Sequence, residues 1–199
     1  FVAEALSKQL GQSIVVENRP GAGSTLASAE LARAEADGYT LGLGTGTLFG
    51  MDQYLYKVSY TPRDFTPIMR LTISPLLLAV NKSLGINTVD DLIAKVKANP
   101  GKLNYSSSGV GGSPHMAALI FQHAIDGKMV HVPYKGGSPA LQAVASGEVD
   151  LSFGTAPSVL PMSQADKVKV LAVSTLEGSE AAPGVAPLRK QGLRAFDFT

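Results

Sequence analysis

Cysteine does not occur in this sequence of 199 residues. Its absence excludes a disulfide framework, a metal site built on thiolates and a cysteine nucleophile. An excess of charge of either sign is also lacking, because 17 basic residues stand against 16 acidic ones and the net charge is +1. Without a basic excess or a run of Lys and Arg, the sequence gives no reason to expect a nucleic-acid partner.

Long hydrophobic runs are missing as well. The longest apolar stretch, residues 74–80, has the length of a strand, whereas a helix that crosses a bilayer needs roughly 20 apolar residues. These 199 residues contain no signal-peptide pattern. The sequence opens on Phe1, without a start Met, inside a predicted helix, residues 1–10, that Gly11 ends. At the other end, residues 192–199 have the pattern of a strand. We therefore expect the chain to be part of a longer protein.

What the sequence does contain is a regular alternation of short strands and helices. One predicted helix begins with a capping box from Thr88 to Asp91 and stops at Pro100. Such alternation predicts an α/β fold with a mainly parallel sheet that helices cover on both faces. The predicted strands are residues 13–17, 39–43, 73–80, 102–109, 128–134, 148–154 and 168–175, and further helices are predicted at 26–36 and from Pro114, Pro139 and Pro157.

Glycines and hydroxyl residues gather between predicted strands and helices, most densely in residues 106–113. Three helices follow such loops with a Pro in the first turn, and the Ser before Pro114 and before Pro139 is expected to cap. Free N–H groups at a helix start attract anions, and parallel strands gather these loops at their carboxyl ends. We therefore expect a small anion here, most simply a carboxylate. The alternative is that these residues only form turns and caps.

Other site patterns are incomplete. Gly21 and Gly23 follow a predicted strand as in a dinucleotide fingerprint, but the third small residue is misplaced and the next strand lacks the acid that holds a ribose. Ser138 resembles a nucleophile elbow, yet Pro139 after it has no N–H to offer an oxyanion. The histidines lack metal-ligand spacing. His115, in the first turn of a predicted helix, either reaches a ligand or faces water.

Seven motifs occur in order along the chain and together point to one family. The sequence resembles the substrate-binding proteins of tripartite tricarboxylate transporters, the TctC or Bug type. The resemblance covers almost all of the chain, and three of the motifs are quite specific in combination (ENRPGAG, DGYTL and HVPYKG). The seven are VVENRPGAGS, ADGYTLGLGT, PGKLNYSSSG, GSPHMA, VHVPYKGG, GEVDLSFG and VKVLAVST.

This resemblance implies a two-lobed α/β fold of the periplasmic binding-protein type II class, with the ligand in the cleft between the lobes. Lobe I would comprise residues 1–74 and 170–199 and be incomplete, and lobe II would comprise residues 75–169. The protein would be a periplasmic monomer without cofactor, metal or catalytic residue, and would deliver a small organic carboxylate to membrane permease subunits. The ligand-binding residues carried over from the family are Ala22, Thr45, Thr47, Ser106, Ser107, Ser108, Gly109, His115, Gly154 and Thr155.

Two alternatives stay open. One is an α/β enzyme acting on a small anion, for which the sequence nominates no nucleophile, base and orienting group together. The other is a sensor subunit that presents its liganded form to a receptor.

The predicted cleft loops also bear on the class of ligand. The family often has an acid where this chain has Gly154, and none of the other predicted cleft loops supplies one. Asp150 is nearby but is expected to lie deeper in the sheet. A buried ammonium group needs an anionic partner. We therefore expect a carboxylate without an amine, such as a dicarboxylate or an aromatic acid.

Overall fold

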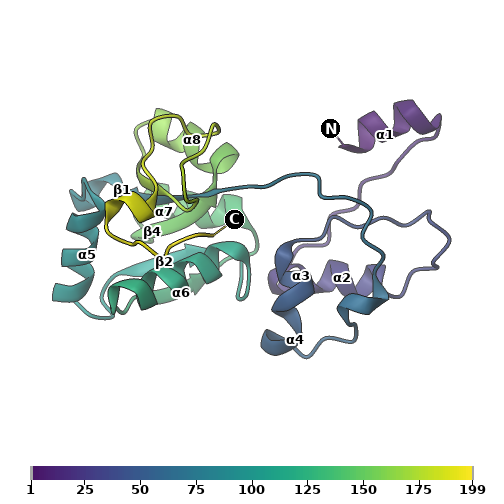
Figure 1. Cartoon of the computed structure of the whole chain (residues 1–199), viewed down its shortest axis with the longest axis horizontal. Coiled ribbons are helices and arrows are strands. Elements are labelled where there is room, and N and C mark those ends of the chain that lie inside the picture. Colours follow the sequence, from purple (N-terminus) through teal and green to yellow (C-terminus); the bar gives the residue numbers. More distant parts are fainter. Residues whose placement is uncertain (1, 199) are drawn as a thin grey trace.

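The computed structural model describes residues 2–198, which form two regions joined by an extended segment (Figure 1). We call residues 2–74 the helical region and residues 75–198 the sheet region. The helical region contains α1 (Val2–Leu10), η1 (Ala22–Ser24), α2 (Thr25–Leu31), α3 (Gly46–Gly50), α4 (Asp52–Leu55) and η2 (Pro62–Asp64). The sheet region contains β1 (Leu76–Asn81), η3 (Lys82–Leu84), α5 (Val89–Ala98), β2 (Asn104–Ser107), α6 (Ser113–Ile125), β3 (Val130–Pro133), α7 (Gly137–Ser146), β4 (Leu151–Thr155), α8 (Ala156–Gln164), β5 (Val168–Val173) and η4 (Leu188–Gln191).

The sheet is five-stranded, with the order β3-β2-β4-β1-β5. β2 runs parallel to both β3 and β4, whereas β1 is antiparallel to its neighbours β4 and β5. β1 therefore opposes the direction of the other strands. The α/β class with helices on both faces is confirmed, and the sheet is mixed because the strand that enters from the helical region runs against the rest.

The core of the sheet region lies in two layers, one on each face of β1. Alternate residues of a strand point to opposite faces. Leu78 accordingly packs with residues of α5 and α6, such as Phe121, while Leu77 packs with residues of α7 and α8, such as Val144 and Val159. Every residue of β1 is buried, as expected for a central strand that helices cover on both sides.

The predicted N-cap residue is observed for α5 but not for α6 and α7. The capping box of α5 is confirmed: the Asp91 N–H donates to Thr88 Oγ1 over 3.0 Å, and the Thr88 N–H donates to Asp91 Oδ2 over 2.9 Å. Hydrogen bonds from Asn87 and Thr88 lower the pKa of the Asp91 carboxyl. The expectation that serines cap α6 and α7 is wrong. Both helices begin earlier, so glycines take the N-cap position and Ser113 and Ser138 lie inside the first turn.

Two predicted strands in the helical region do not form. Residues 13–17 and 39–43 are irregular, and most of their apolar side chains face solvent; Val15 is 82% exposed and Tyr39 is 92% exposed. A strand is stable only when it pairs with others and buries one face. No strand forms among residues 2–75, so these β-branched segments have no partner there. The predicted helix at 26–36 is also shorter, ending at Leu31.

The segment after β5 packs on the sheet region. Phe196 stacks on Phe153 of β4 with ring centroids 6.1 Å apart, and the Leu76 N–H donates to Ser174 Oγ over 2.9 Å. η4 adds the fully buried Leu188 to the same layer as Phe196. The described part of residues 170–199 therefore lies against the strand through which the chain enters the sheet.

Candidate functional site

The carboxyl ends of β2, β3 and β4 meet at the edge of the sheet that faces the helical region (Figure 1). Ser107 pairs with Pro133, and Ser106 pairs with Ser152, so the loops that follow these parallel strands start side by side. β1 begins at the same edge, because Leu76 pairs with Thr155. This edge is where ligands bind in open α/β sheets.

The three consecutive serines of the β2 loop have different surroundings. Ser106 is fully buried, and its hydroxyl donates to the Ala140 carbonyl of α7 over 2.8 Å. Ser107 is also fully buried, and its Oγ accepts the Gly109 N–H over 3.1 Å and lies 3.0 Å from the Gly109 carbonyl oxygen. Ser108 is half-buried, and its hydroxyl makes no hydrogen bond with residues 2–198. Of the three, Ser108 is the hydroxyl that is available to a ligand.

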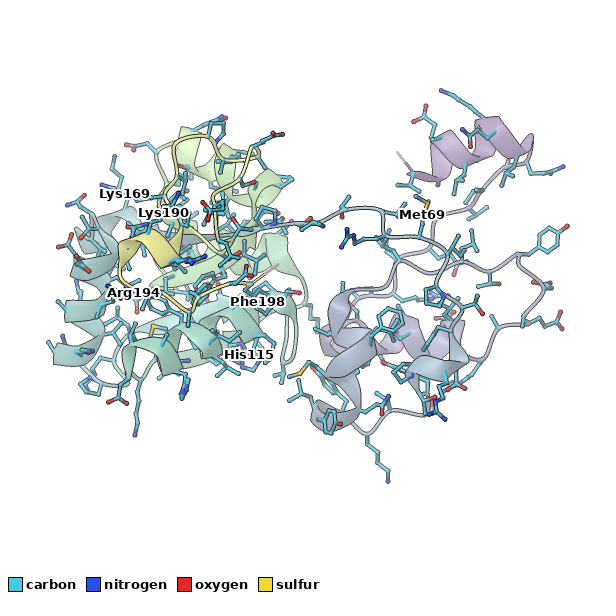
Figure 2. All side chains as sticks on the ribbon, in the orientation of Figure 1. Met69, His115, Lys169, Lys190, Arg194 and Phe198 are labelled. Atoms are coloured by element: carbon cyan, nitrogen blue, oxygen red, sulfur yellow. The ribbon has the colours of Figure 1, made fainter. Side chains whose placement is uncertain are left out.

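Two imidazoles lie stacked beneath this loop. The ring centroids of His115 and His131 are 4.0 Å apart with an interplanar angle of 17°, and the Tyr105 ring lies 4.9 Å from His131. His131 Nε2 is 2.7 Å from Ser107 Oγ, and His115 Nδ1 accepts the Gly111 N–H over 3.0 Å. Burial lowers the pKa of His115, and burial together with the neighbouring His115 lowers the pKa of His131 to about 4. Figure 2 shows His115 on the side of the sheet region that faces the helical region.

A left-handed turn of the helical region lies against the β2 loop. Four consecutive residues have positive φ: Gly21 at 124°, Ala22 at 45°, Gly23 at 63° and Ser24 at 80°. Ala22 and Ser24 are strained there, because side chains disfavour this conformation, and such strain concentrates at functional sites. A Cβ on Gly23 would stand 2.6 Å from the Val110 carbonyl oxygen. The predicted Ala22 and Gly109 segments are thus in contact.

Tyr56, which follows α4, joins the two regions directly. Its hydroxyl donates to the Val110 carbonyl, and burial, followed by the charge of Asp52, raises its pKa. A Cβ on Gly111 would lie 2.6 Å from Leu55 and 3.4 Å from the Tyr56 ring. Tyr56 could not be predicted as a site residue from the sequence, because no local pattern relates it to a loop more than 50 residues away.

Thr45 and Thr47 lie at the start of α3, where their hydroxyl oxygens are 2.9 Å apart. Thr45 is exposed and Thr47 is buried. A small cavity beside α2 is lined in part by Thr45, Ser24 and Asp52. Asp52 is 3% exposed and accepts the Tyr60 hydroxyl over 2.8 Å; burial, and then this bond, raises the pKa of Tyr60 to about 12.

Asp52 is an acid near Thr45 that was not predicted from the sequence. It lies two positions after the GTGTLFG loop, outside the segment that was expected to line the cleft. Asp150, by contrast, lies at the opposite end of β4, where its Oδ2 accepts the Asn104 N–H over 2.8 Å.

Gly154 and Thr155 lie at the end of β4 beside β1, where they pair with Leu77 and Leu76. Thr155 is the N-cap residue of α8, and its Oγ1 is 3.2 Å from Ser158 Oγ. A Cβ on Gly154 would lie 2.8 Å from the side chain of Val159 in α8, so any side chain at this position would require Val159 to shift.

Among residues 2–198, no helix combines the length and apolar character needed to cross a bilayer. The described side chains likewise form no cluster of three or more His, Cys, Asp or Glu residues that would hold a metal ion.

Comparison with known proteins gives consistent matches over the whole chain. A profile of the "Tripartite tricarboxylate transporter family receptor" matches residues 1–199. The structure is similar to that of R. palustris Rpa4515 with adipate, with 32% identity, a TM-score of 0.94 and coverage of 98% of this chain and 66% of that one. It is also similar to MatC from Rhodopseudomonas palustris with bound malate, with 32% identity, a TM-score of 0.91 and coverage of 98% and 67%.

A third solved structure, the periplasmic binding protein BugD, is 28% identical with a TM-score of 0.89 and coverage of 98% of this chain and 66% of that one. This chain spans 59%, 57% and 61% of the length of three curated relatives that it matches at 31–33% identity.

Proposed function

This chain belongs to the tripartite tricarboxylate transporter receptor family, and from that premise we propose that it captures a small organic carboxylate between two lobes and delivers it to a membrane permease. The family and its structural neighbours are solute-binding proteins, not enzymes. The observation that carries the proposal is the contact between the left-handed turn at Ala22 and the Gly109–Gly112 loop. A Cβ on Gly109 would likewise lie 3.4 Å from the Gly23 nitrogen, so the backbones of the two regions meet at this place.

The proposed site uses backbone and hydroxyl donors. Ser108 offers its free hydroxyl. Gly109 has no side chain, so a carboxylate can approach its backbone closely. Ser106, Ser107 and His115 are buried in the sheet region beneath the loop. The hydroxyls of Thr45, Thr47 and Thr155 complete the proposed set of donors. Hydrogen bonds to a charged group contribute about 1.5–3 kcal/mol each. The residues assigned to the site are Ala22, Thr45, Thr47, Ser106, Ser107, Ser108, Gly109, His115, Gly154 and Thr155.

We assign residues 1–74 and 170–199 to lobe I and residues 75–169 to lobe II, with β1 and β5 as the strands between the lobes. In this structure residues 170–198 nevertheless pack on the sheet region, where Leu188 and Phe196 belong to the same core layer as Phe121. The antiparallel pairing of β1 with β5 supports a hinge at their shared end, and closure about such a hinge traps ligands in many binding proteins. The protein is assigned to the periplasm as a monomer. BugD is a periplasmic protein of the same family.

The ligand proposed is a carboxylate without an amine. Rpa4515 binds adipate and MatC binds malate, and both ligands are dicarboxylates that carry no ammonium group. Gly154 stands where the family often has an acid, and a Cβ added to it would lie 2.8 Å from the Val159 side chain. Asp52 lines the same small cavity as Thr45, and its carboxylate already accepts the Tyr60 hydroxyl.

A thermal-shift comparison of matched ligands tests this function. Succinate is paired with aspartate and glutarate with glutamate, and adipate and malate are included as reference acids. We expect the amine-free acids to raise the melting temperature more than their amino-acid partners. Larger shifts with the amino acids would contradict the ligand class, and mass spectrometry of a ligand that co-purifies would then identify the true one.

A further inference from the structure

The β2 loop is held from below by the two stacked imidazoles. The Gly111 N–H donates to His115 Nδ1, and Ser107 Oγ contacts His131 Nε2. These contacts flank Gly109 and Val110, the residues that meet the helical region. The conformation of the loop at the proposed site therefore depends on ring nitrogens that lie on its inner side.

The hydrogen-bond pattern also fixes the position of the His115 ring proton and restricts that of His131. Because His115 Nδ1 accepts an N–H, the neutral ring carries its proton on Nε2. Ser107 has one hydroxyl proton, and its Oγ already accepts the Gly109 N–H. If that proton goes to the Gly109 carbonyl, His131 must donate to Ser107 through Nε2–H. Both rings then act as uncharged groups with defined orientations.

We propose that His115 and His131 are positioning residues of the carboxylate site, which fix the Ser107–Gly112 loop through Gly111 and Ser107 without touching the ligand. This proposal rests on the carboxylate-binding function above and assigns its geometry to two side chains. His131 was not identified from the sequence, and His115 was expected as a ligand contact. The observed partner of His115 Nδ1 is the loop backbone, which is why a positioning role is assigned to it.

Paired amide substitutions separate positioning from ligand contact. In His115→Asn the side-chain oxygen can occupy the place of Nδ1, whereas in His115→Gln the amide extends to the place of Nε2. For His131 the order is reversed, because Ser107 is reached through Nε2. The positioning role therefore predicts that Asn is the better replacement at 115 and Gln is the better replacement at 131.

Amide hydrogen exchange measures the hydrogen bonding of the loop in the absence of any ligand. We expect the Gly111 amide to exchange roughly three- to tenfold faster in His115→Gln than in His115→Asn, the range for one lost hydrogen bond. The Gly109 amide should exchange faster in His131→Asn than in His131→Gln. Melting temperatures of all four variants show whether a variant has simply lost its fold. Equal exchange within each pair, or the opposite order, would overturn the proposal.

Calorimetric titration with adipate and malate supplies the second readout. We expect His115→Asn to bind roughly three- to tenfold more tightly than His115→Gln, and His131→Gln more tightly than His131→Asn by a similar factor. Tighter binding by His115→Gln than by His115→Asn would mean that Nε2 contacts the ligand directly. If the wild type binds neither acid, the proposed ligand class fails, while the exchange experiment still decides the role of the imidazoles.

Discussion

The sheet region and the helical region of this protein are built from equally apolar segments but bury them to different extents. In the sheet region, β1 is buried along its whole length, and two core layers cover its faces. In the helical region, α1 has no buried residue, and Val15 and Leu43 are 82% and 83% exposed. The buried residues of the helical region are Thr25, Thr47, Leu48, Asp52 and Tyr60.

This difference shows that strand-forming sequence is not sufficient for a strand. Residues 13–17 have the same β-branched character as β5, yet β5 pairs with β1 and residues 13–17 pair with nothing described. Pairing supplies both the backbone hydrogen bonds and the buried face that a strand needs. The sheet region therefore carries its own stability, whereas the helical region depends on contacts outside itself.

Separating the two regions should produce the largest effect. We expect residues 75–199 alone to keep a cooperative thermal transition, because both core layers lie within them. Residues 1–74 alone should show no such transition. Circular dichroism of the two fragments checks this, with the intact chain as the reference. A cooperative transition in residues 1–74 would show that the helical region has a core of its own.

Alanine substitutions of one buried and one exposed leucine test the same difference in burial. Leu78 is fully buried in β1, so Leu78→Ala should lower the free energy of unfolding by about 2–5 kcal/mol. Leu43 is 83% exposed, and Leu43→Ala should change it by less than about 0.5 kcal/mol. Urea denaturation measures both. A comparable loss in the two variants would contradict the difference in burial.

The contact between the regions can be broken at one glycine. Gly23→Ala would place a Cβ 2.6 Å from the Val110 carbonyl oxygen, so the loop has to move, and adipate affinity should fall about tenfold. Gly11 has a similar φ of 65° with nothing within 4 Å of the added Cβ. Gly11→Ala therefore carries the same backbone strain without the clash. Calorimetry should show lost affinity only in Gly23→Ala; equal affinities would remove this contact from the site.

Local patterns in the sequence predicted most of the sheet region. The continuous apolar run of β1 indicated a strand buried on both faces, and Thr88 with Asp91 indicated the start of α5. The wrong serine caps arose because Gly112 and Gly136 took the N-cap positions just before them. The failed strands at 13–17 and 39–43 depended on partners, which a local pattern does not reveal.

The geometry of the site could not be predicted in this way. His115 and His131 meet only because β2 lies between β3 and β4 and pairs with β3 in register, with Tyr105 opposite His131. That register is a long-range property of the sheet. Tyr56 likewise reaches Val110 through the placement of two whole regions. The sequence indicated the β2 loop through its glycines and hydroxyls, but not what holds it.

The serines of the β2 loop should differ in what their substitution changes. Ser108→Ala should weaken adipate binding about tenfold if its hydroxyl contacts the carboxylate. Ser106→Ala removes the bond to the Ala140 carbonyl, so it should lower the free energy of unfolding by about 1 kcal/mol and affect binding less. Calorimetry and urea denaturation together give both quantities. A larger loss of affinity in Ser106→Ala would reverse these roles.

The last effect expected is a change in the pH dependence of stability caused by His131. Its pKa in the folded protein is lowered from 6.5 to about 4, by burial and then by His115, so the unfolded chain takes up the proton first. The stabilisation by the neutral ring is therefore complete above pH 6.5 and is lost as the pH falls toward about 4. Urea midpoints at pH 7 and pH 4.5 should differ less in His131→Gln than in the wild type. The same substitution at an exposed histidine, His123→Gln, is the matched control variant. If His131→Gln keeps the wild-type difference, then the His131 ring is not held neutral beneath the loop, and its protonation does not distinguish the folded from the unfolded chain.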